Sequence, residues 1–299
     1  MMSPDDLSIV ISSVLGLVLA IPSNTCIVMG NLDIIRKKGK LSPSDVIFLG
    51  KGIVNILLQC VMSLQGMLLV LCPEIFFIIQ VYVFVNISGY FLIYYSFWLT
   101  FWLSAHYCTS ITNLSYGFFI WIKRIVSNFL SLLLFLTALV LFIVTVPGFL
   151  ILYGESISSS ENSTEASDNK FHEIFSGYMA ATTLVLPFCL SLLCLVLTSS
   201  FLLRHVWRVK NNDSGSTRPN LQAHVTALRT IFFLFLIFTI FCMSQAFLFL
   251  PNFSLFIVGW NLQLLSPSVE AAVIFQASNK LRRIILRRFW TRSRRNTET

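Results

Sequence analysis

Charged residues are scarce in this 299-residue chain. They make up 11% of it, whereas an average soluble domain has about a quarter. Hydrophobic residues reach 56%, and the mean hydropathy is +0.80. This composition excludes a soluble domain and predicts an integral membrane protein. The segments between the apolar runs are too short for a separate soluble domain, so we expect partners to contact the faces of the membrane bundle.

The chain also lacks features that would indicate other functions. Its first 30 residues have no basic n-region and no small-residue cleavage site, so they predict an uncleaved helix rather than a signal peptide. No Cys/His pair has metal-site spacing, and none of the seven cysteines lies in the polar segment 151–175. Glu270 is the only acidic residue deep in an apolar run, which disfavours an intramembrane hydrolase. We therefore expect no catalytic residues, metal or cofactor.

Uncharged or nearly uncharged runs of about 20 residues, enough to span a bilayer as a helix, occur seven times. Ser44 or Asp45 is suited to cap the start of the second. The expected fold is one all-α domain, residues 1–299, a bundle of seven transmembrane helices followed by a basic tail, 278–299. The predicted helices span about residues 7–30, 46–71, 80–111, 128–150, 176–203, 230–250 and 255–277.

Basic residues are concentrated after the first, third, fifth and seventh predicted helices, whereas acidic residues dominate the opposite segments. By the positive-inside rule, the N-terminus is predicted outside and the C-terminus in the cytoplasm. The basic tail lies close to lipid headgroups and to any acidic partner surface, so nucleic-acid binding is not expected. The basic residues expected to face a cytoplasmic partner are Lys123, Arg124, Arg208 and Arg229.

The third predicted helix carries large aromatic side chains at three- and four-residue spacing. Tyr94 or Tyr95, Trp98 and Trp102 share one face of an α-helix. Such a face can line a pocket, or it can serve packing or an interfacial belt.

The same helix carries a family resemblance. After Trp98 come Leu103-Ser104 with Tyr107, then Asn113-x-Ser115 and the run FIWIK at 119–123. This order resembles the third-helix signature of the type 2 (bitter) taste receptors, which are G-protein-coupled receptors. A D-R-Y at the end of this helix and an N-P-x-x-Y in the seventh are missing, which disfavours an ordinary rhodopsin-like receptor.

Further motifs in the fifth and sixth helices are similar to those of the same family. Pro187 begins P-F-x-x-S-L, and His205 ends L-x-H. His224 lies in the A-H-x-x-A-L-R run, the closest match in the chain. The two histidines flank the third inner loop, where they are either solvated or form a hydrogen-bonded clasp.

The resemblance implies a plasma-membrane receptor that detects small bitter-type molecules and couples to a gustducin-like heterotrimeric G protein. It implies a ligand pocket in the outer half of the bundle, lined by Tyr95, Trp98, Trp102 and Trp260, and a glycosylated Asn162 in the outer loop. A vomeronasal type 1-like receptor is an alternative that the A-H-x-x-A-L-R spacing suits less well. A seven-helix transporter is another, although the sequence shows no internal repeat.

Two departures from the family pattern place ionisable residues inside predicted helices. Where the family has L-A-x-S-R, this chain has Lys51-Gly52-Ile53-Val54-Asn55, and Glu270 replaces the histidine of H-S in helix seven. Intramembrane ionisable residues are usually paired. Lys51 and Glu270 therefore form an ion pair or are solvated separately in a polar cavity. Asn24, in the first helix, should hydrogen-bond to another helix.

Overall fold

The computed structural model of the chain describes residues 3–111, 117–158, 181–211, 218–248, 253–278 and 282–283. Helices make up nearly all of this part, and it contains no strand. The named elements are α1 (Pro4–Lys38), α2 (Pro43–Leu71), α3 (Pro73–Phe76), α4 (Ile79–Ile111), α5 (Gly117–Asn128), α6 (Leu130–Ser158), the π-helix η1 (Ala181–Val185), α8 (Leu186–Asn211), α9 (Arg218–Leu248) and α10 (Phe253–Ala277).

Seven of the described helices are long and apolar enough to cross a membrane. Each corresponds to one predicted apolar run, which confirms the all-α seven-helix fold class. The spans are Pro4–Lys37, Pro43–Leu71, Ile79–Ser110, Leu130–Ile151, Thr182–Phe201, Leu228–Gln245 and Ser254–Ala277.

Local signals set the ends of the first two helices. Ser3 and Asp6 form a capping box at the start of α1, and Gly39, at φ 73°, ends it in the left-handed conformation that glycine tolerates. The helix therefore continues beyond residue 30, where its apolar run ends. The hydroxyl of Ser42 accepts a hydrogen bond from the Asp45 backbone N–H and caps α2. The expectation that Ser44 or Asp45 is this cap is wrong, because Pro43 already occupies the first helical turn.

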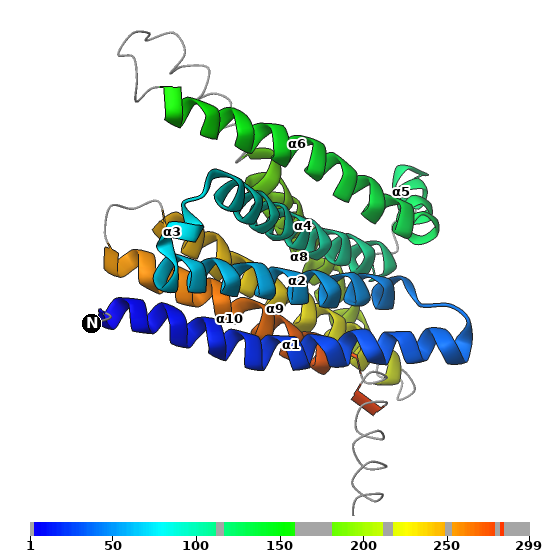
Figure 1. The fold of residues 1–299 in the computed structure, drawn as a ribbon. Coiled ribbons are helices and arrows are strands. Elements are labelled where there is room, and N and C mark those ends of the chain that lie inside the picture. Colours follow the sequence, from blue (N-terminus) through cyan, green and yellow to red (C-terminus); the bar gives the residue numbers. More distant parts are fainter. Residues whose placement is uncertain are drawn as a thin grey trace, which may run out of the picture.

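The helices lie side by side as a bundle, with α1 and α6 on opposite sides (Figure 1). Helix α4 is central, because it packs against α2, α6, α8 and α9. The fully buried apolar residues of the bundle include Leu99 and Leu103 of α4 and Phe238 of α9. Every neighbour of α4 is thus positioned by contacts with one long helix.

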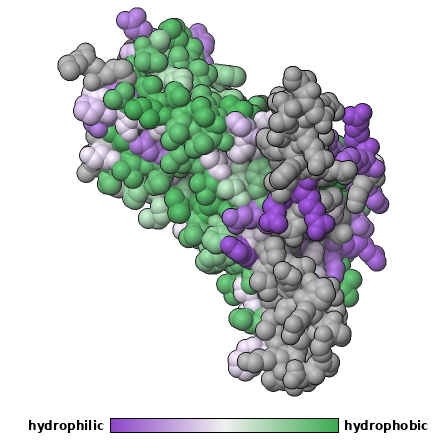
Figure 2. Space-filling view, turned by 90° about the horizontal axis from the view of Figure 1, so that it is seen from below, coloured by the Kyte–Doolittle hydropathy of each residue, from purple (hydrophilic) through white to green (hydrophobic). Residues whose placement is uncertain are grey.

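The two ends of the bundle differ in charge. The end where α1, α4 and α8 finish is basic, whereas Asp5, Asp6 and Glu74 lie at the other end. Figure 2 shows hydrophobic side chains over much of the visible face and hydrophilic ones gathered mainly toward one end. The exposed basic residues of the first end are Arg36, Lys37, Lys40, Lys123, Arg124, Arg204, Arg229, Arg282 and Arg283.

Candidate ligand site and buried polar cluster

A cavity of about 370 Å³ lies between α4, α6 and the start of α8, and we call it the side cavity. Trp98 and Trp102 form its α4 wall. No charged side chain is among the described residues that line it. The rest of the lining is apolar or carries a hydroxyl: Leu133, Leu136, Thr137, Val140, Leu141 and Val144 of α6, Thr182 and Thr183 of η1, and Leu186 of α8.

The spacing of four residues places both tryptophans on one face of α4. The Phe101 ring packs edge-on against Trp98, with centroids 5.5 Å apart, and lies 5.0 Å from the Trp102 ring. Trp102 Nε1 donates a hydrogen bond to Thr137 Oγ1 (3.0 Å), and that hydroxyl donates to the Leu133 carbonyl (2.7 Å). The Trp102 indole is therefore fixed against α6.

Trp98 differs from Trp102 in its polar atom. Its Nε1 is buried and has no hydrogen-bond partner in the described part of the chain. An N–H removed from water without an acceptor is energetically costly. This N–H is enclosed by the side chains around it and does not open onto the side cavity.

The third wall of the side cavity depends on Pro187. This buried proline is the second residue of α8, which begins directly after the π-helix η1. Proline has no N–H to donate to the preceding turn, and a π-helical turn accommodates the change in hydrogen-bond register. Thr182, Thr183 and Leu186 reach the cavity from this irregular segment.

Of the four aromatic residues expected to line one pocket, Trp98 and Trp102 line the side cavity and the other two do not. Tyr95 donates from its hydroxyl to the Leu134 carbonyl of α6 (3.4 Å) and is not part of the lining. Trp260 is buried elsewhere, stacked on Phe256 at 6.1 Å and next to Gly66 of α2. Helical spacing determines which residues share a face, but it does not determine which neighbouring helix that face meets.

The depth of the tryptophans also differs from the expectation. The midpoint of the 33-residue α4 falls at Tyr95, so Trp98 and Trp102 lie past it, on the side nearer Ile111. The side cavity is therefore near the middle of the membrane span rather than in the half nearer Ile79.

A second site lies on another side of α4, between α1, α2 and α10. Lys51 Nζ donates to both Glu270 carboxylate oxygens at 2.8 Å and to Ser96 Oγ at 3.3 Å. The Lys51 side chain is 0% exposed and the Glu270 side chain is 9% exposed. The ion pair that the sequence left open is thus present, and Ser96 adds a contact from α4. Each of the two charges lies within a membrane span and has the other as its partner.

Two asparagines extend this arrangement to α1. Asn55 Nδ2 donates to Glu270 Oε2 (3.0 Å) and to Asn24 Oδ1 (3.3 Å). Asn24 Nδ2 donates to the Pro267 carbonyl of α10 (3.1 Å), which confirms the expected bond to another helix. We call Asn24, Lys51, Asn55, Ser96 and Glu270 the buried polar cluster.

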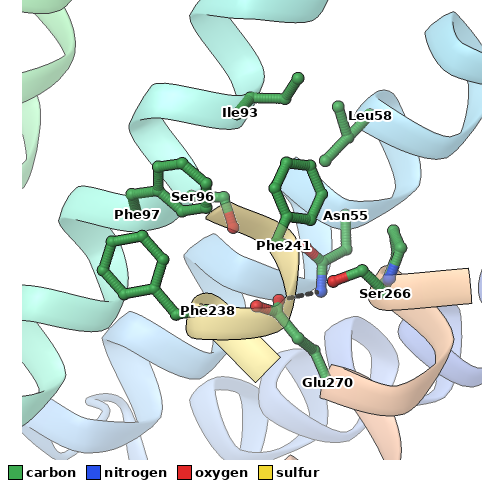
Figure 3. A pocket seen from close by; sticks show the side chains of 10 residues that line it. Asn55, Leu58, Ile93, Ser96, Phe97, Phe238, Phe241, Ser266 and Glu270 are labelled. Carbon is green, nitrogen blue, oxygen red and sulfur yellow. Dashed lines mark hydrogen bonds between the residues drawn. The ribbon is translucent and has the colours of Figure 1, made fainter. Parts of the chain in front are cut away.

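A small cavity of about 10 Å³ adjoins the buried polar cluster. Figure 3 shows Asn55 and Glu270 facing one another there, joined by a hydrogen bond, with Ser96 and Ser266 close by. Asn55 Oδ1 is buried and has no partner among the described residues. A space of this size with several polar neighbours suits about one water molecule.

Comparison with known proteins decides the family. The family model for taste receptor proteins (TAS2R) matches residues 1–293. The chain belongs to this family. Membership makes it a chemosensory G-protein-coupled receptor for bitter compounds and a multi-pass protein of the plasma membrane.

Individual taste receptors match over most of the chain. Taste receptor type 2 member 8 of Papio hamadryas is 28% identical over 303 residues, which cover 96% of each chain. Member 9 of Homo sapiens is 27% identical over 91% of this chain and 89% of its own. Member 40 of Gallus gallus is 27% identical over 77% of this chain and 74% of its own.

The other predicted site residues of this taste receptor are placed only in part. Lys123 and Arg124 are exposed on α5, and the exposed Arg229 guanidinium lies 5.5 Å from the Phe233 ring centroid. His205 and Arg208 lie on α8 and His224 lies on α9, but their side chains are outside the described part. Asn162 is also outside the described residues.

Two residues of the sites could not have been singled out from the sequence. Thr137 orients Trp102 and Ser96 contacts Lys51, yet each is one hydroxyl residue among several in an apolar run. Their importance arises only from the helix that each one meets.

Proposed function

We propose that this taste receptor binds small, uncharged bitter-type agonists in the side cavity. The supporting observation is a cavity of about 370 Å³ walled by Trp98 and Trp102 and lined by no charged residue among those described. Small-molecule sites commonly have about 300–1,000 Å³ and a mostly apolar lining with a few polar groups. Tyr95 contributes by holding α6 against α4 through Leu134. Trp260 contributes by packing α10 against α2.

Agonist potency tests the assignment of this site. Ala substitution at Trp98 or Trp102 should raise the half-maximal agonist concentration at least about tenfold, equivalent to about 1.4 kcal/mol. The measurement is calcium imaging of transfected cells with a panel of bitter compounds. Phe84→Ala removes an exposed aromatic residue from the same helix outside the cavity and serves as the matched control. Unchanged potency for several chemically distinct agonists in both tryptophan variants would place the site elsewhere.

The proposed partner is a gustducin-like heterotrimeric G protein at the basic end of the bundle. Lys123 and Arg124 on α5, together with Arg229 on α9, present positive charge there, and Arg208 lies on the adjoining α8. Such a surface is complementary to an acidic partner surface and speeds encounter with it. Agonist-stimulated binding of a GTP analogue to purified gustducin should fall in a Lys123→Gln, Arg124→Gln variant. Equal stimulation of wild type and variant would contradict the assigned surface.

The proposed orientation has the N-terminus outside and the basic end in the cytoplasm. It is supported by the basic residues gathered at one end, because positive charge favours cytoplasmic loops. Asn162-Ser163-Thr164 is then an outer-loop sequon and should be glycosylated. Peptide N-glycosidase should change the gel mobility of wild type but not of Asn162→Gln. If the Gln variant shifts to the same extent, the orientation or the sequon is wrong.

A further inference from the structure

Helix α5 is short and amphipathic, and it is not one of the seven candidate membrane spans. It packs against α4 and α6, and its residue Val126 is buried. Ile120 and Trp121 are 51% and 59% exposed. The helix has two basic residues, both exposed, and no acidic residue. One side of α5 therefore holds it to the bundle, and the other presents large apolar side chains next to positive charge.

The exposed side of α5 continues the exposed side of α6, which enters a membrane span directly after it (Figure 1). At the corner between them, the Phe129 N–H donates to the Ile125 carbonyl and the Leu133 N–H donates to the Phe129 carbonyl, both at 2.9 Å. These bonds keep the helical spacing, so Trp121, Ile125 and Phe129 lie along one side. Phe129 and Leu132 are also exposed, at the edge of the span. Trp121 thus lies near the membrane boundary, on the side open to lipid.

Positive charge lies between the two exposed apolar residues of α5. Arg124 follows Trp121 by three residues and Ile120 by four, so the three share one side of the helix. Exposing Ile and Trp side chains to water costs free energy. A G protein would cover them only while it is bound, whereas lipid covers them in the resting receptor as well. Tryptophan and snorkelling arginine are both suited to the level of the headgroups, where a cation meets phosphate.

We infer that α5 is a lipid-binding helix, which inserts Ile120 and Trp121 at the edge of the bilayer and holds the headgroup of an anionic phospholipid with Lys123 and Arg124. A zwitterionic headgroup carries its own cation, so it gains less from two basic side chains. The inference goes beyond the proposed function, because the lipid binds without agonist and without G protein. In the proposed orientation this lipid belongs to the cytoplasmic leaflet, which is rich in anionic lipids.

Quenching of Trp121 fluorescence by brominated lipids tests both the position of α5 and its headgroup preference. The full-length receptor is placed in nanodiscs of equimolar phosphatidylserine and phosphatidylcholine, in which only one of the two lipids carries brominated acyl chains. The Trp121 signal is the difference between wild type and Trp121→Phe. Both brominated lipids should quench it. Phosphatidylserine should be enriched beside Trp121 about fivefold, the factor that one basic residue provides near an anionic surface.

Two matched double variants test which basic residues hold the headgroup. Lys123→Gln, Arg124→Gln should remove the preference for phosphatidylserine, while brominated phosphatidylcholine still quenches Trp121. Arg36→Gln, Lys37→Gln removes two exposed basic residues from α1 at the same end of the bundle, and it should keep the preference. Each variant is compared with its own Trp121→Phe form. Elution as a single species in gel filtration checks that each one is folded.

Three results would overturn the inference. Equal quenching of wild type by the two lipids would show contact with the bilayer but no headgroup selection. No quenching of Trp121 by either lipid would leave this side of α5 to a protein partner. Loss of the preference in the α1 variant as well as in the α5 variant would assign it to the charge of the whole end.

The G-protein assay separates this inference from the proposed function. The expected quenching pattern, combined with normal agonist-stimulated binding of the GTP analogue in Lys123→Gln, Arg124→Gln, would retain the lipid site and remove both residues from the proposed G-protein surface. Reduced binding of the GTP analogue in a receptor whose wild type shows no lipid preference would retain that surface and overturn the lipid site.

Discussion

The buried polar cluster and the side cavity lie on different sides of α4 and differ in their hydrogen bonding and in the space that they enclose. In the cluster, Lys51, Glu270 and the two asparagines bond to one another across helices, and the adjoining space is only about 10 Å³. In the side cavity, one indole N–H is unpartnered among the described residues, and the space is about 370 Å³. The comparison indicates that the first region holds the bundle together, whereas the second has the room that ligand binding needs.

The cluster contains residues at which this sequence departs from the motifs that it resembles. By that resemblance, arginine is expected at the position of Asn55, and Lys51 lies one helical turn before it. Glu270 accepts from both residues, so a single carboxylate connects α2 with α10, and Asn24 adds α1. Removing one charge of an ion pair in lipid leaves the other charge unpaired, so it destabilises the protein more than removing both charges.

The largest expected effect is the loss of one partner of this pair. Lys51→Met or Glu270→Gln leaves a buried charge or its partners uncompensated, a cost of about 3–5 kcal/mol in soluble proteins. Surface labelling of transfected cells should show a strong fall for each single variant and a smaller fall for the double variant. Losses that simply add in the double variant would refute a role for the pairing in stability.

The next effect concerns the packing that positions the cluster helices. A Cβ at Gly66 would lie 2.7 Å from Ser13 Oγ and 3.3 Å from Trp260 Cζ2, so Gly66→Ala should cost about 1–3 kcal/mol. Gly50→Ala on the same helix is the control, because its nearest neighbour would be Leu99 at 3.7 Å. Thermal unfolding in detergent should show a lower midpoint for Gly66→Ala alone. Equal midpoints would indicate that α1, α2 and α10 can separate slightly without cost.

A smaller effect is expected in the side cavity. Thr137→Val removes the acceptor that orients Trp102, at a net cost of about 0.5–1.5 kcal/mol, so agonist potency should fall severalfold. Thr145→Val on the same helix is the matched control, since Thr145 Oγ1 has no hydrogen-bond partner in the described structure. Concentration–response curves in calcium imaging measure both. Equal potency of the two variants would show that the indole of Trp102 needs no orientation.

The smallest effect is expected for Ser96→Ala. The Ser96 contact with Lys51 is long, at 3.3 Å, and Glu270 already holds the ammonium with two shorter bonds. Surface expression should therefore stay close to wild type, with a cost below about 1 kcal/mol. A loss as large as that of Lys51→Met would mean that α4 is an equal partner in the cluster.

Much of the fold followed from the sequence, because each apolar run is long enough to span and is bounded by charge or polar residues. The ion pair could also be predicted as one of two alternatives, since Lys51 and Glu270 are opposite charges at similar depth in lipid. The side cavity could not be predicted from the sequence. The spacing of Trp98 and Trp102 gave the face they share, but only the packing of α4 against α6 decides that this face meets Thr137. For the same reason, nothing in the local pattern of Trp260 shows that it packs beside Gly66.

The most direct measurement records surface expression and agonist potency in the same cells for Trp98→Ala and for Lys51→Met. We expect each variant to lose one of the two measured properties and to keep the other. Trp98→Ala should lose potency at least about tenfold with normal surface expression, whereas Lys51→Met should lose surface expression while the molecules that reach the surface keep near-normal potency. If Lys51→Met loses potency at equal surface density while Trp98→Ala responds normally, the division between a structural cluster and a ligand cavity is wrong.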